Sequence, residues 1–341
     1  MSTTKTISIS SSTIFKVVFI ILAIIFLYLV RDVIAIFIFA LIIASAIAPV
    51  VNLLERIKIP RVIGALIIYI IVIGFIGLVL SLIIPGLSRD VGDLSSNLPA
   101  YIEDLSEKFE SFKKASTKYG GIIDKAQNYL IGAGDLLKKA TSNLFSTAVS
   151  IFGGIFSFLT ALIVSFYLSV QKKGIKNALA SIIPHQHKDY ILGLWERSQR
   201  KLGRWLQGQL FLGLVVGTMS YIGLTLLNVK FALVLAILAG TFELLPYIGP
   251  IMSGIPAVIL AFLQAPILGF WVLILYIVIQ QLENNLIVPL VVGKIVKLSP
   301  VIIILALLIG AKLGGIVGMF LAVPITAVVA EFFRDIVKKR K

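Results

Sequence analysis

Two carboxylate residues lie inside apolar stretches of the sequence, where charged side chains are rare. Glu243 follows the apolar run 231–242, and Glu283 lies in a second apolar segment with amide residues on both sides of it. A carboxylate at membrane depth costs several kcal/mol unless it is paired, protonated or in contact with water. Burial favours the neutral form of a carboxyl group, so such a residue can take up and release a proton. The two glutamates therefore indicate a site for a proton or a cation.

Polar residues near the two carboxylates could supply further ligands. Carboxylate and amide oxygens suit a hard cation such as Na⁺ and a polyhydroxylated solute alike. A tyrosine can stack on a solute ring or bond to it, and a lysine can bind an anionic group. The candidate substrate-binding or ion-coupling residues are Glu243, Glu283, Asn284, Asn285, Gln280, Gln281, Tyr247 and Lys312.

Each candidate also has a structural interpretation without transport. Glu243 could accept hydrogen bonds from backbone amides at a helix break, and the amides around Glu283 could bond to neighbouring helices. Tyr247 fits an interfacial aromatic residue. Lys312 fits a lysine whose stem is buried while its ammonium group reaches water. The sequence leaves both interpretations open.

Prolines and glycines interrupt the segments that carry these residues. Pro246, Gly249, Pro250 and Pro256 lie so close together that no unbroken helix is expected to pass through them. Broken backbone at membrane depth survives only where it is buried in protein or lines a cavity, as in transporters with discontinuous helices. The predicted breaks and hinges are Pro246, Gly249, Pro250, Pro256, Pro289, Gly314, Gly315 and Pro324.

Composition identifies the class of protein. Of the 341 residues, 59% are hydrophobic and 14% are charged, against about 45–50% and about 25% in soluble domains, so we expect a multi-pass membrane protein in contact with the lipid bilayer. The net charge of +15 lies in short loops and at the C-terminus, which follows the positive-inside rule rather than indicating nucleic acid. The chain has no cysteine, which excludes disulfides and thiolate chemistry.

Motifs for enzymatic or ATP-driven function are missing from the sequence. It contains neither a GxxxxGK[ST] phosphate loop nor a GxSxG nucleophile motif. His185 and His187 have no third ligand nearby in the sequence and are typical of surface residues, so we expect no metal site. The prediction is a secondary transporter without a cofactor and without enzymatic activity.

The N-terminal half is predicted to alternate between membrane and water. Residues 14–84 form three transmembrane helices, the first two as a tight pair, and the basic loop 55–61 between the second and third lies in the cytoplasm. Residues 85–146 are amphipathic with balanced charge, which predicts an external helical hairpin that packs on itself or on a neighbouring subunit. The predicted spans are 14–30, 33–54 and 60–84.

The C-terminal half is predicted to hold the transport machinery. Its basic stretch carries Trp195 and Trp205 on one face, which is typical of a helix in the membrane interface. Two further full spans are expected at 206–227 and 267–290. The predicted divisions are a transmembrane helix within 147–170, a basic cytoplasmic interfacial helix at 171–206, a transport core at 207–333 and a basic cytoplasmic tail at 334–341.

Two stretches of the sequence are predicted to form broken helical hairpins. The segments 231–245 and 251–264 give roughly 21–23 Å of helix each, less than the ~30 Å hydrocarbon core. Residues 231–264 and 299–333 are therefore expected to be re-entrant from opposite faces, although each stretch could instead form two full spans. The predicted fold is all-α, with about six full spans, two re-entrant or broken hairpins, an external amphipathic insert and both termini in the cytoplasm.

Three motifs in order resemble the autoinducer-2 exporter family along nearly the whole chain. They are FELLPYIGP at 242–250 with Pro256 behind it, QQLENNLIVP at 280–289, and a final stretch that opens with Ser-Pro at 299–300 and contains Gly314-Gly315 and Pro324. The resemblance implies a multi-pass exporter of small molecules, and some members of the family are similar to sodium/proton antiporters. It also implies homo-oligomers, with a pentamer as the expected form.

These observations favour export of a small polar, autoinducer-2-like solute by alternating access. Glu243 and Glu283 would couple transport to H⁺ or Na⁺. One alternative is an antiporter that exchanges Na⁺ or Li⁺ for H⁺, with the cation itself as substrate. A second is a membrane scaffold that binds a partner through the external insert.

Overall fold

The computed structural model describes residues 11–78, 81, 154–171, 174–291 and 298–339, and within these ranges every regular element is a helix. The predicted external insert at 85–146 lies outside them. The elements are α1 (Ser11–Leu29), α2 (Arg31–Arg56), a helix at Arg61–Leu78, α5 (Gly154–Val170), α6 (Gly174–Ile182), the 3₁₀ turn η2 (His185–His187), α7 (Lys188–Leu226), α8 (Ala232–Phe242), α9 (Ile248–Gln264), α10 (Pro266–Leu282), the π-helix η3 (Glu283–Ile287), α11 (Val288–Val291) and α12 (Pro300–Lys339).

Six of the described helices are long and apolar enough to cross a membrane. The predicted all-α, multi-pass architecture is confirmed at this level. Shorter apolar helices accompany the six at Phe156–Val170, Ala232–Phe242 and Ile248–Phe262. The six candidate spans are Ser12–Leu29, Arg31–Arg56, Arg61–Leu78, His185–Leu226, Pro266–Val291 and Pro300–Val337.

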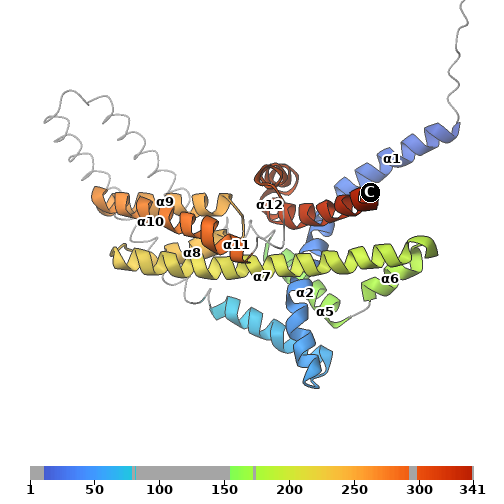
Figure 1. Ribbon diagram of the computed structural model, residues 1–341, viewed down its shortest axis with the longest axis horizontal. Coiled ribbons are helices and arrows are strands. Elements are labelled where there is room, and N and C mark those ends of the chain that lie inside the picture. The colour runs from blue at the N-terminus through green and yellow to red at the C-terminus, as the bar shows by residue number, and fades with distance from the viewer. Residues whose placement is uncertain (1–10, 79–80, 82–153, 172–173, 292–297, 340–341) are drawn as a thin grey trace, which may run out of the picture.

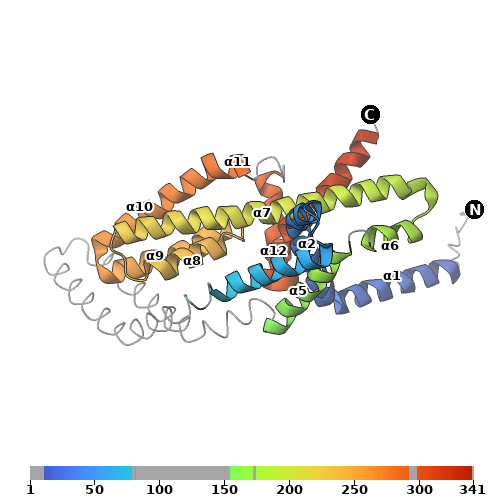
Figure 2. The ribbon, with the colours of Figure 1, turned by 90° about the horizontal axis from the view of Figure 1, so that it is seen from below.

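Helix α7 is the central element of the fold. Its 39 residues give a rod of roughly 58 Å. Helices α8, α9 and α10 run beside its C-terminal half in both ribbon views, and α2 and α12 cross it near its middle (Figures 1 and 2). At the crossing with α2, a Cβ on Gly203 would overlap the carbonyl oxygen of Ser45, so glycine permits this close approach.

The basic segment predicted at 171–206 is not a helix of its own. α6 and η2 are separate, but residues 188–206 continue into the apolar half of α7 without a break. Their apolar face packs on protein: Leu202 and Trp205 are buried in the main core. The Trp205 ring meets the edge of the Phe320 ring, with 5.2 Å between centroids. Trp205, one of the two tryptophans that suggested an interfacial helix, thus packs against α12.

The predicted tight pair of N-terminal helices is absent from the structure. α1 diverges from α2 (Figures 1 and 2), and none of its membrane-length window is buried. Bulky side chains such as Phe15, Phe19 and Phe26 cover α1, and α1 has no stripe of small residues along which a second helix could approach closely. Its surface suits contact with lipid.

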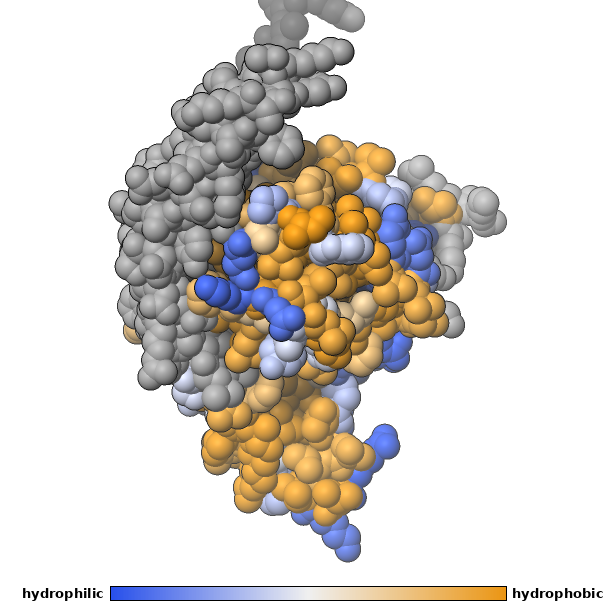
Figure 3. Space-filling model, turned by 90° about the vertical axis from the view of Figure 1, so that its left-hand side faces the viewer, coloured by the Kyte–Doolittle hydropathy of each residue, from blue (hydrophilic) through white to orange (hydrophobic). Residues whose placement is uncertain are grey.

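Much of the described surface is hydrophobic. Figure 3 shows this at the end of the molecule where α7 ends and α10 begins. Leu226, Ile267 and Phe270 are all exposed there. An apolar surface of this extent is not stable in water and indicates burial in a bilayer or in an assembly.

Candidate functional site

A tight turn joins α8 to α9 and carries the first carboxylate. The backbone N–H groups of Leu245 and Gly249 donate to the carbonyl oxygens of Phe242 and Leu245, both over 2.8 Å. A Cβ on Gly249 would overlap the Phe242 carbonyl oxygen. Tyr247 takes up a left-handed backbone conformation with φ 65°. Glu243, directly after the last residue of α8, is thereby held on the inner side of the turn, with 2% of its surface exposed.

A π-helical turn carries the second carboxylate. α10 ends at Leu282, and η3 takes over from Glu283 to Ile287. A π-turn accommodates one extra residue and shifts the helix faces that follow it, and such turns are frequent at functional sites. Glu283 is buried at 5% exposure, while Asn284 and Asn285 are exposed. The π-turn therefore separates a buried carboxyl group from two surface amides.

The two carboxyl groups meet. The side chains of Glu243 and Glu283 lie next to each other and interact. Two adjacent carboxyl groups can form a hydrogen bond with each other when one of them carries a proton. Gln280 donates its Nε2 hydrogen to Oε2 of Glu283 over 3.2 Å. Oε2 of Glu243 is buried and has no hydrogen-bond donor within the described structure.

Gln209 on α7 is a site residue that the sequence analysis did not select. It is buried, and its Nε2 donates to the backbone carbonyl oxygen of Glu243 over 2.8 Å. An amide in the otherwise apolar span 206–227 was the available signal, but such a residue is as often a helix-packing contact. The hydrogen bond fixes the end of α8 against α7.

Glycines let α7 and α8 approach each other beside Glu243. A Cβ on Gly240 would lie 2.6 Å from the carbonyl oxygen of Gly213 and 3.4 Å from the Cα of Gly217. Distances this short leave no room for side chains, so the two backbones touch. These three glycines thus bring the α8–α9 turn close to α7.

The remaining predicted ligands lie elsewhere. Asn285 donates from Nδ2 to Oε1 of Gln281 over 3.0 Å at the surface. Tyr247 and Lys312 are exposed, and neither forms a hydrogen bond or ion pair with the two carboxyl groups within the described residues. Of the eight predicted ligand residues, the structure groups only Glu243, Glu283 and Gln280 at one place.

His185 and His187 lie in η2 and are exposed. Among the residues that the structure describes, no group of three or more His, Cys, Asp or Glu side chains could hold a metal ion. The candidate site is therefore built from carboxyl and amide groups.

The predicted breaks fall into two kinds. Pro246 and Gly249 lie in or at the α8–α9 turn, and Pro250 occupies the first turn of α9. Pro256, Pro289 and Pro324 instead lie inside helices α9, α11 and α12, which continue through them.

α12 contains the second break. Gly314 and Gly315 have non-helical backbone angles, and Gly315 has a φ of 58°, which favours glycine. The carbonyl oxygens of Gly310 and Gly318 would each overlap a Cβ on the other residue, although residues eight apart in a straight helix are about 12 Å apart. The two halves of α12 therefore fold back and cross at these glycines (Figure 1).

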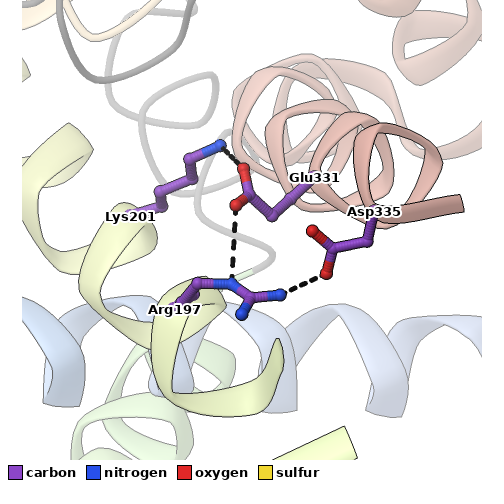
Figure 4. A network of polar contacts seen from close by, with 4 residues as sticks. All are labelled: Arg197, Lys201, Glu331 and Asp335. Carbon is purple, nitrogen blue, oxygen red and sulfur yellow. Dashed lines mark hydrogen bonds and ion pairs between the residues drawn. The ribbon is translucent and has the colours of Figure 1, made fainter. Parts of the chain in front are cut away.

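Four charged residues connect α7 to the last turns of α12 (Figure 4). Glu331 accepts a hydrogen bond from Nζ of Lys201, and its other oxygen lies 3.5 Å from Nε of Arg197. Arg197 also donates to Asp335. Both basic residues lie in the stretch predicted as a basic cytoplasmic helix at 171–206, and their acidic partners are at least 130 residues away along the chain.

Comparison with known proteins places this arrangement in a family. Residues 16–338 match the family described as AI-2E family transporter. The chain belongs to the AI-2E family. The Bacillus subtilis protein named "Putative transport protein YueF" is a relative that is 33% identical over 301 residues, which covers 85% of this chain and 80% of that protein.

Two further relatives also have names that describe transport. "Putative transport protein YrrI" of Bacillus subtilis is 28% identical over 85% of this chain and 83% of its own length. "Putative permease PerM" of Escherichia coli is 25% identical over 71% of this chain and 68% of its own length. The chain is thus a member of a family of transport proteins, and the resemblance seen in its motifs is confirmed.

Proposed function

We propose that this AI-2E family protein exports a small polar, autoinducer-2-like solute across the cytoplasmic membrane by alternating access, coupled to H⁺ or Na⁺. The observation that carries the proposal is the close approach of the buried carboxyl groups of Glu243 and Glu283 to each other. Buried polar groups of this kind are costly and are found mainly at transport sites.

The coupling step follows from the charge of the pair. With one proton, the two carboxyl groups attract each other and hold the α8–α9 turn on η3. Without it, two negative charges at hydrogen-bond distance repel each other strongly in a poorly solvated site. Loss of the proton therefore opens the contact, unless a cation or a hydroxyl-rich solute replaces it.

The broken helices supply the moving parts. α8 and α9 have 11 and 17 residues, so each is shorter than a span of about 20 residues. We propose that 231–264 and 299–333 are re-entrant hairpins from opposite faces, with both termini in the cytoplasm and the subunits assembled as a homo-oligomer. Inverted hairpins of this kind let a site open to either side in turn.

A Na⁺(Li⁺)/H⁺ antiporter is the second candidate. Oε2 of Glu243 is the observation that favours it, because this buried oxygen has no hydrogen-bond partner in the described residues. Hard cations bind carboxylate and amide oxygens, so a cation that replaces the shared proton would use the same atoms. In this case the cation is the substrate.

The test is the internal pH of proteoliposomes that contain the purified protein and a pH-sensitive dye. Na⁺, Li⁺ and a furanone-type solute are added in turn to wild type, Glu243→Gln and Glu283→Gln. Glu196→Gln is the matched control because it removes an exposed carboxyl group remote from the pair. We expect proton movement on addition of solute, at least tenfold reduced in both site variants and retained in the control.

The outcomes separate the candidates. Proton movement on addition of cations alone, lost in the site variants, replaces the exporter with the antiporter. Undiminished flux in Glu243→Gln and Glu283→Gln rules out the coupling role of the pair.

A further inference from the structure

Four basic residues of α7 divide into two pairs with different surroundings. Arg197 and Lys201 are bonded to carboxylates of α12 (Figure 4). Arg200 and Arg204, one helical turn apart, are both exposed and form no salt bridge with any residue that the structure describes. The first pair is neutralised within the protein, and the second presents two positive charges to the outside.

Glu196 interacts electrostatically with Arg200 but forms its salt bridge with another residue. Glu196 lies one turn before Arg200 on α7 and is bonded to Lys176, with 2.5 Å between Nζ and the carboxylate oxygen. The positive charge of this ion pair balances the negative charge of Glu196. Arg200 and Arg204 therefore remain in excess at this place on the helix surface.

The exposed face that begins with the two arginines continues as a mostly apolar stripe, which Gln207 and Thr218 interrupt. Positions 200, 204, 207, 211, 214, 218 and 222 are spaced three or four residues apart, so they lie on one side of α7. Phe211, Leu214 and Ile222 are each at least half exposed on this face. A cationic end followed by an exposed apolar stripe is the pattern of a lipid headgroup above its acyl chain.

The position of the arginines along the helix also fits a headgroup. Residues 205–226 contain no Asp, Glu, Lys or Arg and give roughly 33 Å of helix, close to the ~30 Å hydrocarbon core. Arg204 lies directly outside this segment, and Arg200 is about 6 Å further along the axis. Both guanidinium groups are then level with the lipid phosphates, which they can bind through two parallel N–H groups.

We propose that Arg200 and Arg204 form a binding site for an anionic phospholipid, with the phosphate between the guanidinium groups and an acyl chain along Phe211 and Leu214. A nucleic acid or a soluble acidic protein would leave the apolar stripe uncovered. Two copies of this face would bring like charges together. The site is separate from the proposed transport site, because both arginines are exposed whereas Glu243 and Glu283 are buried.

The test is lipid binding by the full-length protein in detergent, measured by native mass spectrometry. Phosphatidylglycerol and phosphatidylcholine with identical acyl chains are compared, and glycerol 3-phosphate supplies the headgroup without chains. The variants are Arg200→Gln/Arg204→Gln and the single Arg204→Gln. Arg56→Gln/Lys58→Gln is the matched control because it removes two exposed charges elsewhere.

We expect wild type to bind phosphatidylglycerol about thirtyfold more tightly than phosphatidylcholine, since each of the two basic residues near the surface contributes about fivefold. The double variant should show a preference of threefold or less, the single variant an intermediate one, and the control the wild-type value. An unchanged preference in the double variant overturns the proposal. Equal loss in the control also overturns it, as does equally tight binding of glycerol 3-phosphate, which would indicate a site for free anions.

Discussion

The side-chain amide of Gln209 donates a hydrogen bond to the backbone carbonyl oxygen of Glu243, with 2.8 Å between donor and acceptor. The last carbonyl groups of a helix have no partner within that helix. Gln209 supplies one at the end of α8, and it does so from α7. The backbone that carries the Glu243 carboxyl group is thus fixed to α7, the longest uninterrupted helix among the described residues.

Gln209→Leu should destabilise the protein. Leucine has nearly the same volume but leaves the buried carbonyl oxygen of Glu243 without a donor, which costs about 1–3 kcal/mol. We expect a lower Tm of the purified protein in detergent and weaker ion-coupled flux. Gln186→Leu in the exposed turn η2 is the control and should change neither value. A wild-type Tm for Gln209→Leu would show that this hydrogen bond adds no stability.

Deletion of Asn284 should reduce transport without reducing the stability of the fold. Without the extra residue, α10 can continue with ordinary α-helical hydrogen bonds, so we expect the protein to fold with a Tm near that of wild type. The helix after the deletion changes face relative to α10, and this moves Glu283 or the residues after it out of their present contacts. Gradient-driven flux should fall at least tenfold. Full flux with a complete α-helix here would mean that the π-turn does not serve the site.

Gly315→Ala and Gly314→Ala form a matched pair. Neither added Cβ would meet another atom within 4 Å, so the two substitutions differ in backbone conformation alone. Only Gly315 has a positive φ, 58°, where an L-residue costs about 1–2 kcal/mol. We therefore expect a lower Tm for Gly315→Ala than for Gly314→Ala. Equal Tm values would place the break of α12 elsewhere in solution.

Glu331→Gln should weaken the contact between α7 and α12. The substitution removes the shared acceptor of Lys201 and Arg197, and for such a partly buried network we expect a loss of about 1 kcal/mol. Salt should lower the Tm of wild type more than that of the variant, because it screens an attraction that the variant lacks. Glu196→Gln, whose ion pair is exposed, is the control with little change. Identical salt dependence in wild type and Glu331→Gln would contradict this role.

The general architecture could be predicted from composition and from the order of three motifs. Long uncharged apolar runs can be satisfied only as helices in a membrane, and the family match confirms the resemblance. Glu243 and Glu283 could be selected one at a time, because a carboxylate in an apolar run is unusual wherever it occurs. The contact between the two glutamates could not be predicted, because it depends on how the α8–α9 turn packs on η3.

Other site features had no local signal. The sequence around Asn284 does not specify a π-turn, and without its shift of helix faces the asparagines were expected beside Glu283. Gln209 becomes a partner of Glu243 only because Gly213 and Gly240 let two backbones touch. Arg197 and Glu331 are charged residues in water-accessible segments, where many pairings are possible and only the fold selects one.

The uninterrupted helix α7 has a mechanical consequence. Arg197 and Lys201 attach it to the end of α12, Gly203 to α2, and Gln209 to the backbone of Glu243. Backbone hydrogen bonds connect consecutive turns of a helix, so the residues of α7 that make these contacts move together. A displacement of the C-terminal end of α12 is therefore transmitted along α7 to the backbone of Glu243.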